Sequence, residues 1–312
     1  MTIVFKVSDN IKEKMIEYYR DLKREKTPPY ATFQADEAET VITLYESGKV
    51  VFQGESADID ANMWKDLEKS VNNRDIDLEL NKENNKKDEE KDTRFIGVPT
   101  IGSDETGIGD YFGPVVVSAT YVGKEHFNLL YDLGVKDSKK INDFKIMKIA
   151  PIIMKNIPYV SYILTNKEFN EKPTNMNKIK ALLHNKALCS LLKKDNFNYK
   201  YIVVDQFCYP KVYFSHLKEV SEKCTNITFT TKAEDKVLSV AAASIISRYI
   251  LLLEFKKLGD SLNIILKKGA SNMVDQQGAM IVKKYGEKKL AEIAKLSFKN
   301  TDKIKAILKD QA

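Results

Sequence analysis

The chain has 312 residues, 43% of them hydrophobic and 30% charged, and a formal net charge of +6. This length accommodates two domains, and the modest positive excess permits a polyanionic partner without requiring one. Three cysteines without a CxxC pair argue against a disulfide framework and against a zinc site. The amino terminus turns polar too early for a signal peptide, and the longest apolar run, YILLLEF at 249–255, is too short to span a bilayer. We therefore expect a soluble, cytoplasmic protein.

Residues 1–78 predict a small α+β unit of order β-α-β-β-β-α. Alternating apolar and polar residues predict four strands, at 2–7, 30–36, 40–46 and 49–54. Apolar residues at helical spacing predict one helix at 9–26, ended by the prolines that follow, and a second at 56–70. We expect a curved sheet covered on one face by two helices, with Trp64 in the core.

The stretch NKENNKKDEEKDTR at 81–94 contains no hydrophobic residue. Such a segment buries too little apolar surface to offset the entropy of ordering it, which predicts a flexible linker at 79–94. A charged surface helix is the alternative. Under either interpretation a domain boundary falls here.

Residues 95–312 predict a mixed α/β domain. Two strands around the glycines of GSDETGIGDYFGP form a hairpin, and further strands are predicted at 159–165, 200–205 and from 227. Helices are predicted at 174–195 and 236–258, with two more from about 277. The small residues 241–244 make the 236–258 helix thin enough to lie close to a sheet.

Acidic residues recur at the ends of these strands: Asp104–Glu105, Asp205 and Glu234–Asp235. An acid directly after a buried strand is unfavourable unless it is paired, bound to a metal or at the edge of the sheet. Carboxylates without histidine or cysteine partners suit Mg²⁺ or Mn²⁺, and two such ions about 4 Å apart support phosphodiester hydrolysis. The alternative is that each acid caps a turn or pairs with one of the many lysines.

Several ordered motifs of the chain resemble those of bacterial ribonuclease HIII. They are DETGIGDYFGPVVVSATYV, GVKDSKKI, NMNKIKALLHN, VVDQF, KAEDKVLSVAAASIISR and KGASNMVD. PPYATFQAD and YESGKVVFQG resemble the TATA-box-binding-protein-like amino-terminal domain of that family. The resemblance implies a ribonuclease H-like catalytic domain that hydrolyses the RNA strand of RNA–DNA hybrids by a two-metal-ion mechanism with Mg²⁺ or Mn²⁺, giving 5′-phosphate and 3′-hydroxyl ends.

The resemblance also implies the site residues. The catalytic and metal-binding acids fall on Asp104, Glu105, Asp205 and Glu234. Adjacent strand residues point to opposite faces, so Asp104 and Glu105 serve one site only where the strand ends or twists, and the glycines are expected to provide that break.

Substrate contacts are expected at two further places. The turn Gly107-Ile108-Gly109 replaces the Gly-Arg-Gly turn that contacts the ribose 2′-hydroxyl in related type 2 enzymes, and isoleucine offers only its backbone for that purpose. By resemblance Lys139 lies near a substrate phosphate.

Ser297 stands where the family often has histidine, which puts any histidine-dependent contact there in doubt. His184 has no partner motif, and a structural role is favoured for it.

The amino-terminal unit has no evident catalytic acids and is expected to grip the substrate, with candidate contacts from Lys6, Tyr30 and Lys49. Two rival functions remain. One is a ribonuclease HII-like enzyme that nicks DNA at single embedded ribonucleotides. The other is a non-catalytic nucleic-acid-binding protein of the same fold. We expect a monomer that acts on RNA–DNA hybrids without a membrane partner.

Overall fold

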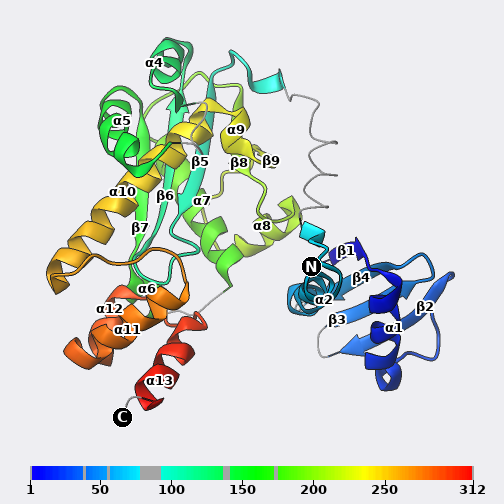
Figure 1. The fold of residues 1–312 in the computed structure, drawn as a ribbon. Coiled ribbons are helices and arrows are strands. Elements are labelled where there is room, and N and C mark those ends of the chain that lie inside the picture. Colours follow the sequence, from blue (N-terminus) through cyan, green and yellow to red (C-terminus); the bar gives the residue numbers. More distant parts are fainter. Residues whose placement is uncertain are drawn as a thin grey trace. The chain divides into compact units, whose positions relative to one another are not determined.

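The computed structural model describes residues 2–37, 40–54, 57–77, 93–135, 141–171 and 175–310. The chain forms two compact units, Met1–Lys91 and Asp92–Ala312 (Figure 1). The predicted linker at 79–94 lies outside the described residues except for Thr93 and Arg94, which belong to the short 3-10 helix η2 (Thr93–Phe95).

The first unit is a four-stranded antiparallel sheet with two helices. Its strands are β1 (Thr2–Lys6), β2 (Ala31–Glu37), β3 (Thr40–Tyr45) and β4 (Lys49–Gly54), in the order β1-β4-β3-β2. Its helices are α1 (Asp9–Tyr18) and α2 (Ala57–Asn72). Both helices share a core with the same face of the sheet, and Trp64 is buried in it. The predicted order and the predicted place of Trp64 agree with the structure.

Helix α1 ends earlier than predicted. It stops at Tyr18, a 3-10 turn η1 (Arg20–Leu22) follows, and Lys23 then bridges to Ala35 of β2. Tyr19 is fixed in the core, where its hydroxyl accepts a 2.9 Å hydrogen bond from the indole of Trp64. The predicted helix 9–26 was too long because the chain beyond Leu22 lies along β2, an interaction that local periodicity does not register.

The second unit contains a five-stranded mixed sheet. Its strands are β5 (Thr100–Thr106), β6 (Val115–Val122), β7 (Tyr159–Leu164), β8 (Tyr201–Asp205) and β9 (Ile227–Thr230). The order is β7-β6-β5-β8-β9, with β5, β6 and β7 antiparallel and β8 and β9 parallel to β5. The expected hairpin and mixed sheet are both present.

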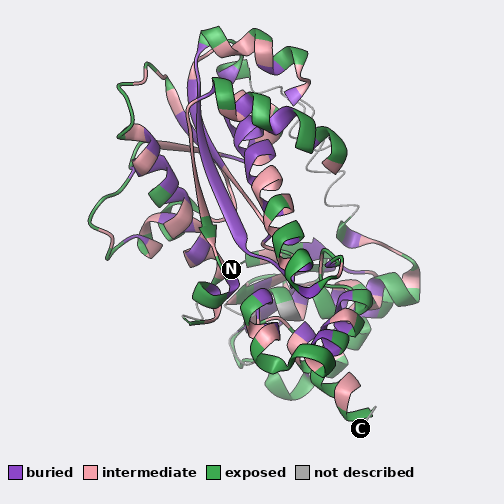
Figure 2. Cartoon of the chain, turned by 90° about the vertical axis from the view of Figure 1, so that its left-hand side faces the viewer, coloured by how far each residue is buried: buried purple, intermediate pink, exposed green. Residues whose placement is uncertain are grey.

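Helices cover both faces of this sheet (Figure 1). One face carries α10 (Leu238–Leu262), against which α5 (Asp143–Asn156) packs; the other carries α7 (Met176–Leu192) with α8 (Pro210–His216) beside it. Figure 2 shows the central strands largely buried between these layers, and β6 is buried along its whole length. Shorter elements connect them: η3 (Lys124–His126), α4 (Phe127–Asp132), α6 (Asn166–Glu171) and α9 (Ala233–Lys236).

Helix α10 lies close to the sheet at Gly102. A Cβ on Gly102 would lie 2.6 Å from the backbone nitrogen of Val240, so only glycine fits there. Among the described helices, α10 is long and apolar enough to cross a membrane, but 56% of its most apolar stretch is buried inside the protein. Its apolar residues pack on β5 and β6, as expected for a core helix.

The carboxyl-terminal part holds three helices where two were predicted. They are α11 (Asn272–Tyr285), α12 (Glu287–Ile293) and α13 (Asn300–Asp310). Gly286, with a φ of +83°, separates α11 from α12. The prediction was wrong because the apolar spacing continues through this break, and it placed the first helix a few residues too late.

Candidate active site

Asp104 and Asp205 lie side by side where two parallel strands part. The pairing of β5 with β8 ends at Ser103 and Val204, so the next residue of each strand is an aspartate. On its other side β5 stays paired with β6 as far as Thr106. The carboxyl ends of parallel strands meet at one edge of a sheet, which is where ligands bind in open α/β folds.

Asp104 and Glu105 point to opposite faces of β5. Asp104 is hydrogen-bonded to the side chain of Ser244 in α10, whereas Glu105 contacts α7. The glycines do not supply a break between the two acids as expected, because the strand remains regular until Gly107. The break lies instead between β5 and β8, because Asp104 has no pairing partner on β8.

Glu105 is held by two residues of α7. The imidazole Nε2 of His184 lies 2.8 Å from Glu105 Oε2, and the Lys180 ammonium forms an ion pair with Oε1. The other ring nitrogen of His184, Nδ1, lies 2.7 Å from Ser103 Oγ. Burial alone would raise the pKa of Glu105, but the hydrogen bond and charge of His184, together with Lys180, lower it to about 2.

Sequence reasoning missed His184 and Lys180 as parts of this site. His184 is fully buried and its ring stacks on Phe207, over which the Lys180 ammonium also lies, 4.0 Å from the ring centroid. The signal was present but weak, since both residues fall on one face of α7 within the KIKALLHN motif. A structural role for His184 agrees with its burial, yet the residue it contacts is a candidate catalytic acid.

Asp205 and Glu234 meet at the start of α9. Asp205 Oδ1 accepts a 2.9 Å hydrogen bond from the Ala233 amide, and Glu234 lies in the first turn of α9. Lys232, just before this helix, has the left-handed φ of 53° that redirects the chain. Burial is the main cause that raises the pKa of Asp205, and the charges of Glu234 and Glu105 add to it.

The four acids (Asp104, Glu105, Asp205 and Glu234) therefore form one electrostatic cluster. Burial raises the pKa of Asp104 well above its usual value, and the charges of Glu105 and Glu234 raise it further. Mutual repulsion of this kind is relieved by a bound cation. Within the described residues no three acidic, histidine or cysteine side chains yet converge on one point. The donor set is nonetheless all oxygen, which fits Mg²⁺ or Mn²⁺.

The glycine turn follows directly on β5. Gly107 has a φ of +84°, and a Cβ there would lie 2.3 Å from the Pro114 carbonyl oxygen. Gly109 is exposed and Ile108 half-buried, and their amides donate to no other residue in the described part of the chain. The turn thus offers free backbone donors beside the acids. Lys139, the other predicted contact, lies outside the described residues.

In the amino-terminal unit, the candidate contacts Lys6 and Lys49 face each other. They form a direct cross-strand pair between β1 and β4, on the sheet face away from α1 and α2. Lys49 Nζ also lies 6.0 Å from the centroid of the Tyr45 ring on the same face. Tyr30 lies in the turn just before β2, is 81% exposed and has a φ of 62°.

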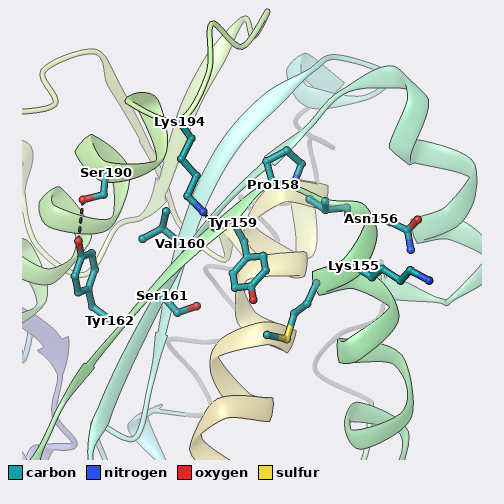
Figure 3. A pocket seen from close by; sticks show the side chains of 11 residues that line it. Lys155, Asn156, Pro158, Tyr159, Val160, Ser161, Tyr162, Ser190 and Lys194 are labelled. Carbon is teal, nitrogen blue, oxygen red and sulfur yellow. Dashed lines mark hydrogen bonds between the residues drawn. The ribbon is translucent and has the colours of Figure 1, made fainter.

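A wide groove of about 710 Å³ lies elsewhere, along the edge strand β7 (Figure 3). It is lined by residues from the end of α5, from β7 and from α7, including Lys155, Tyr159 and Lys194. None of the four acids lines it, and β6 separates β7 from the strand that carries Asp104. The groove is therefore distinct from the candidate active site.

Comparison with known proteins agrees with this geometry. Residues 101–301 match the family model described as Ribonuclease HII, and residues 2–75 match a domain of unknown function, DUF3378. The chain is 41% identical over 309 residues to ribonuclease HIII of Bacillus licheniformis, covering 97% of each chain. It is 40% identical to ribonuclease HIII of Bacillus pumilus, covering 97% of this chain and 98% of the other.

Two solved ribonuclease structures have a fold similar to that of this chain. The fold is similar to the crystal structure of Bst-RNase HIII in complex with Mn²⁺, with a TM-score of 0.67 and 33% identity over 99% of this chain and 100% of that one. It is also similar to ribonuclease H2 from Pyrococcus horikoshii OT3, with a TM-score of 0.57 and 25% identity over 68% of this chain and 99% of that one.

Proposed function

Because the chain belongs to the ribonuclease HIII family, we propose that the four acids are the active site of its metal-dependent endoribonuclease reaction. The protein hydrolyses the RNA strand of RNA–DNA hybrids with a divalent cation, Mg²⁺ or Mn²⁺. We further propose that the products carry 5′-phosphate and 3′-hydroxyl ends.

The observation that carries this assignment is the side-by-side position of Asp104 and Asp205 at the point where β5 and β8 part. Glu234 and Glu105 lie near enough to raise the pKa of Asp205. Buried carboxylates that repel one another destabilise a fold unless a ligand uses them. All four would hold the metal, which when bound activates water and stabilises the leaving oxygen.

The chain's own residues supply the rest of the site. His184 and Lys180 fix the orientation of Glu105. We propose that the amides of Ile108 and Gly109 contact the sugar–phosphate chain, and the lack of a side-chain donor at Ile108 leaves recognition there to the backbone. We keep Lys139 as a proposed phosphate contact.

We propose that the amino-terminal unit grips the substrate through its open face. Two lysines directly opposite each other, Lys6 and Lys49, repel one another in the free protein. A polyanion relieves that repulsion, so the pair is suited to phosphate contacts. Tyr30 is proposed as a further contact because of its high exposure.

Nicking at single embedded ribonucleotides, as by a ribonuclease HII, is not favoured. The relatives that bear the HIII name match nearly the whole chain, including the amino-terminal unit. Cleavage of three labelled duplexes separates the two specificities: RNA–DNA should be cleaved readily, while a single ribonucleotide in DNA and RNA–RNA should not.

The test of the site is Asp104→Asn. This variant should lose hybrid cleavage while it retains hybrid binding, because binding comes mainly from contacts to the backbone of the substrate. The exposed Asp132→Asn serves as a control for the charge change and should cleave normally. EDTA should stop the wild-type reaction, and added Mg²⁺ or Mn²⁺ should restore it. Undiminished cleavage by Asp104→Asn would contradict the assignment of the four acids as the active site.

We also propose that the protein works as a monomer in the cytoplasm, without a membrane partner. All three cysteines, Cys189, Cys208 and Cys224, are free, which agrees with a reducing compartment. Light scattering at working concentration would test the monomer, and a dimer mass would contradict it.

A further inference from the structure

Lys295 is a buried lysine that belongs neither to the four-acid site nor to the sheet face that carries Lys6 and Lys49. It follows α12 and is fully buried. Its ammonium donates two hydrogen bonds, to the Asp110 carbonyl oxygen at 2.7 Å and to the Gly113 carbonyl oxygen at 2.5 Å. Both acceptors belong to the loop that leads from the glycine turn into β6.

This arrangement is unfavourable for an ordinary core position. Burial lowers the pKa of Lys295 to about 8, only partly opposed by the charge of Asp110. No carboxylate oxygen in the described part of the chain pairs with this ammonium, and the Asp110 Oδ1 accepts from the Gly269 amide instead. An apolar side chain would fill the same space without desolvating a charge. The donor itself must therefore serve the fold.

The residues that Lys295 contacts form the anchored half of the loop. The Gly113 amide donates to the Ile293 carbonyl at 2.9 Å, and the Lys295 amide donates to the Tyr111 carbonyl at 2.8 Å. The side chain of Asn166 in α6 donates to the same Gly113 carbonyl at 2.9 Å. By contrast, the amides of the open half, at 108 and 109, donate to no other described residue. The loop is fastened at 110–113, whereas the amides of 108 and 109 make no hydrogen bond to another described residue.

We propose that Lys295 is a positioning residue for hybrid binding. By holding the carbonyls of Asp110 and Gly113, it fixes the direction in which the amides of Ile108 and Gly109 face, toward the sugar–phosphate chain. This inference rests on the proposed function. It assigns to the segment after α12 a role in substrate recognition although Lys295 touches no substrate.

The test compares Lys295→Met with Lys288→Met. Methionine keeps the volume but removes both donors, and Lys288 is an exposed lysine on α12 whose replacement changes the charge equally. Lys295→Met should raise KM for an RNA–DNA hybrid about tenfold, with kcat changed by less than about threefold, because a misdirected turn weakens binding more than the metal chemistry. Lys288→Met should leave both constants unchanged.

Hydrogen exchange provides a readout that does not depend on activity. The amides of Tyr111 and Gly113 should exchange faster in Lys295→Met than in the wild type, while those of α7 and α10 should not change. Wild-type exchange in the loop together with an unchanged KM would overturn the proposal, as would an equal loss in Lys288→Met.

A second variant covers the case in which Lys295→Met does not fold. Asn166→Ala removes the other side-chain donor to Gly113 and should raise KM and loop exchange in the same direction, by a smaller amount. No change in either readout would then overturn the proposal. If the wild-type chain fails to cleave hybrids, the proposed function is wrong, and the exchange rates still decide whether Lys295 holds the loop.

Discussion

Glu105 shows how one side chain is committed by its neighbours. Its two oxygens are divided between His184 and Lys180, so its carboxylate is fixed on the α7 side of the sheet. Asp104, one residue earlier, faces the α10 side, where it meets the side chain of Ser244. The alternation of a regular strand therefore separates the two acids, and the pairing of β5 with β8 ends just before Asp104 and Asp205.

The neighbouring acids Glu234 and Asp235 should differ sharply in importance. Both lie in the first turn of α9, but successive helix residues point in different directions, so we expect only one of them to serve the site. After burial, the charge of Glu234 is one of the causes that raise the pKa of both Asp104 and Asp205. Glu234→Gln should lower kcat at least about 100-fold, because a metal ligand supplies several kcal/mol to the transition state.

Asp235→Asn is the matched control and should lower kcat by less than about fivefold. Single-turnover cleavage at saturating hybrid and metal measures both variants. If Asp235→Asn is the more damaged enzyme, the assignment of the fourth acid is off by one residue.

At the scale of elements, the contact of α10 with β5 places Asp104. Gly102 lets the helix backbone approach the strand, and Ser247 Oγ donates a 3.1 Å hydrogen bond to the Asp104 carbonyl two residues further along. Thr100 and Ser239 are joined by a hydrogen bond of 2.8 Å at the other end of the contact. The small residues of α10 thus fix the position of β5 against the helix, and β5 carries Asp104.

Replacing Gly102 should separate these elements. In Gly102→Ala the new Cβ would lie 2.6 Å from the Val240 backbone nitrogen and from Ser239 Oγ, neither of which can move freely. The free energy of unfolding should fall by about 1–3 kcal/mol, the usual effect of overpacking. Chemical denaturation of the full chain measures this loss.

Gly109→Ala is the control, because a Cβ at Gly109 would meet nothing within 4 Å. Its free energy of unfolding should stay within about 0.5 kcal/mol of the wild type. Equal stability of Gly102→Ala and the wild type would mean that α10 can shift, and that it does not fix the position of Asp104.

At the scale of the whole molecule, the chain folds into two compact units that each have a core. Among the described residues, the core of the first unit extends to Ile76, and the cores of the second begin at Phe95. The acids all lie in the second unit, while the first presents the paired Lys6 and Lys49. Linking a binding module to a catalytic one raises the local concentration of substrate without altering the chemical step.

Removing the lysine pair should weaken binding alone. The double variant Lys6→Gln, Lys49→Gln should raise KM for the hybrid and leave kcat unchanged. The slope of log binding constant against log salt should become shallower by about 0.9 for each phosphate that the variant no longer neutralises. The catalytic fragment 95–312 should show the same direction of change more strongly.

The control is Lys14→Gln with Lys69→Gln, which removes two charges from the helices α1 and α2 on the other side of that unit. Hybrid binding at several salt concentrations compares the two double variants. Equal effects would indicate that only net charge matters, and an unchanged KM in the fragment with a much lower melting temperature would mean that the first unit merely stabilises the second.

The sequence by itself determined the elements that depend on local patterns. Period-two alternation located the strands, VVD at 203–205 and SDE at 103–105 marked acids at strand ends, and the motif order identified the family. It did not predict the number of helices at the carboxyl terminus or the residue at which α1 ends. The apolar pattern continues through both places, whereas Gly286 and the contact of Lys23 with Ala35 end the helices.

Only the tertiary structure decided which residues share a site. His184 and Lys180 are separated from Glu105 by more than seventy residues, and Lys295 is still further from the loop it holds. No spacing rule connects such positions, because they meet through the packing of α7 on the sheet and of the segment after α12 on the glycine loop. From the sequence, a single histidine or lysine is known only to be polar. It becomes part of a site when folding buries it and the surrounding structure determines its hydrogen-bond partners.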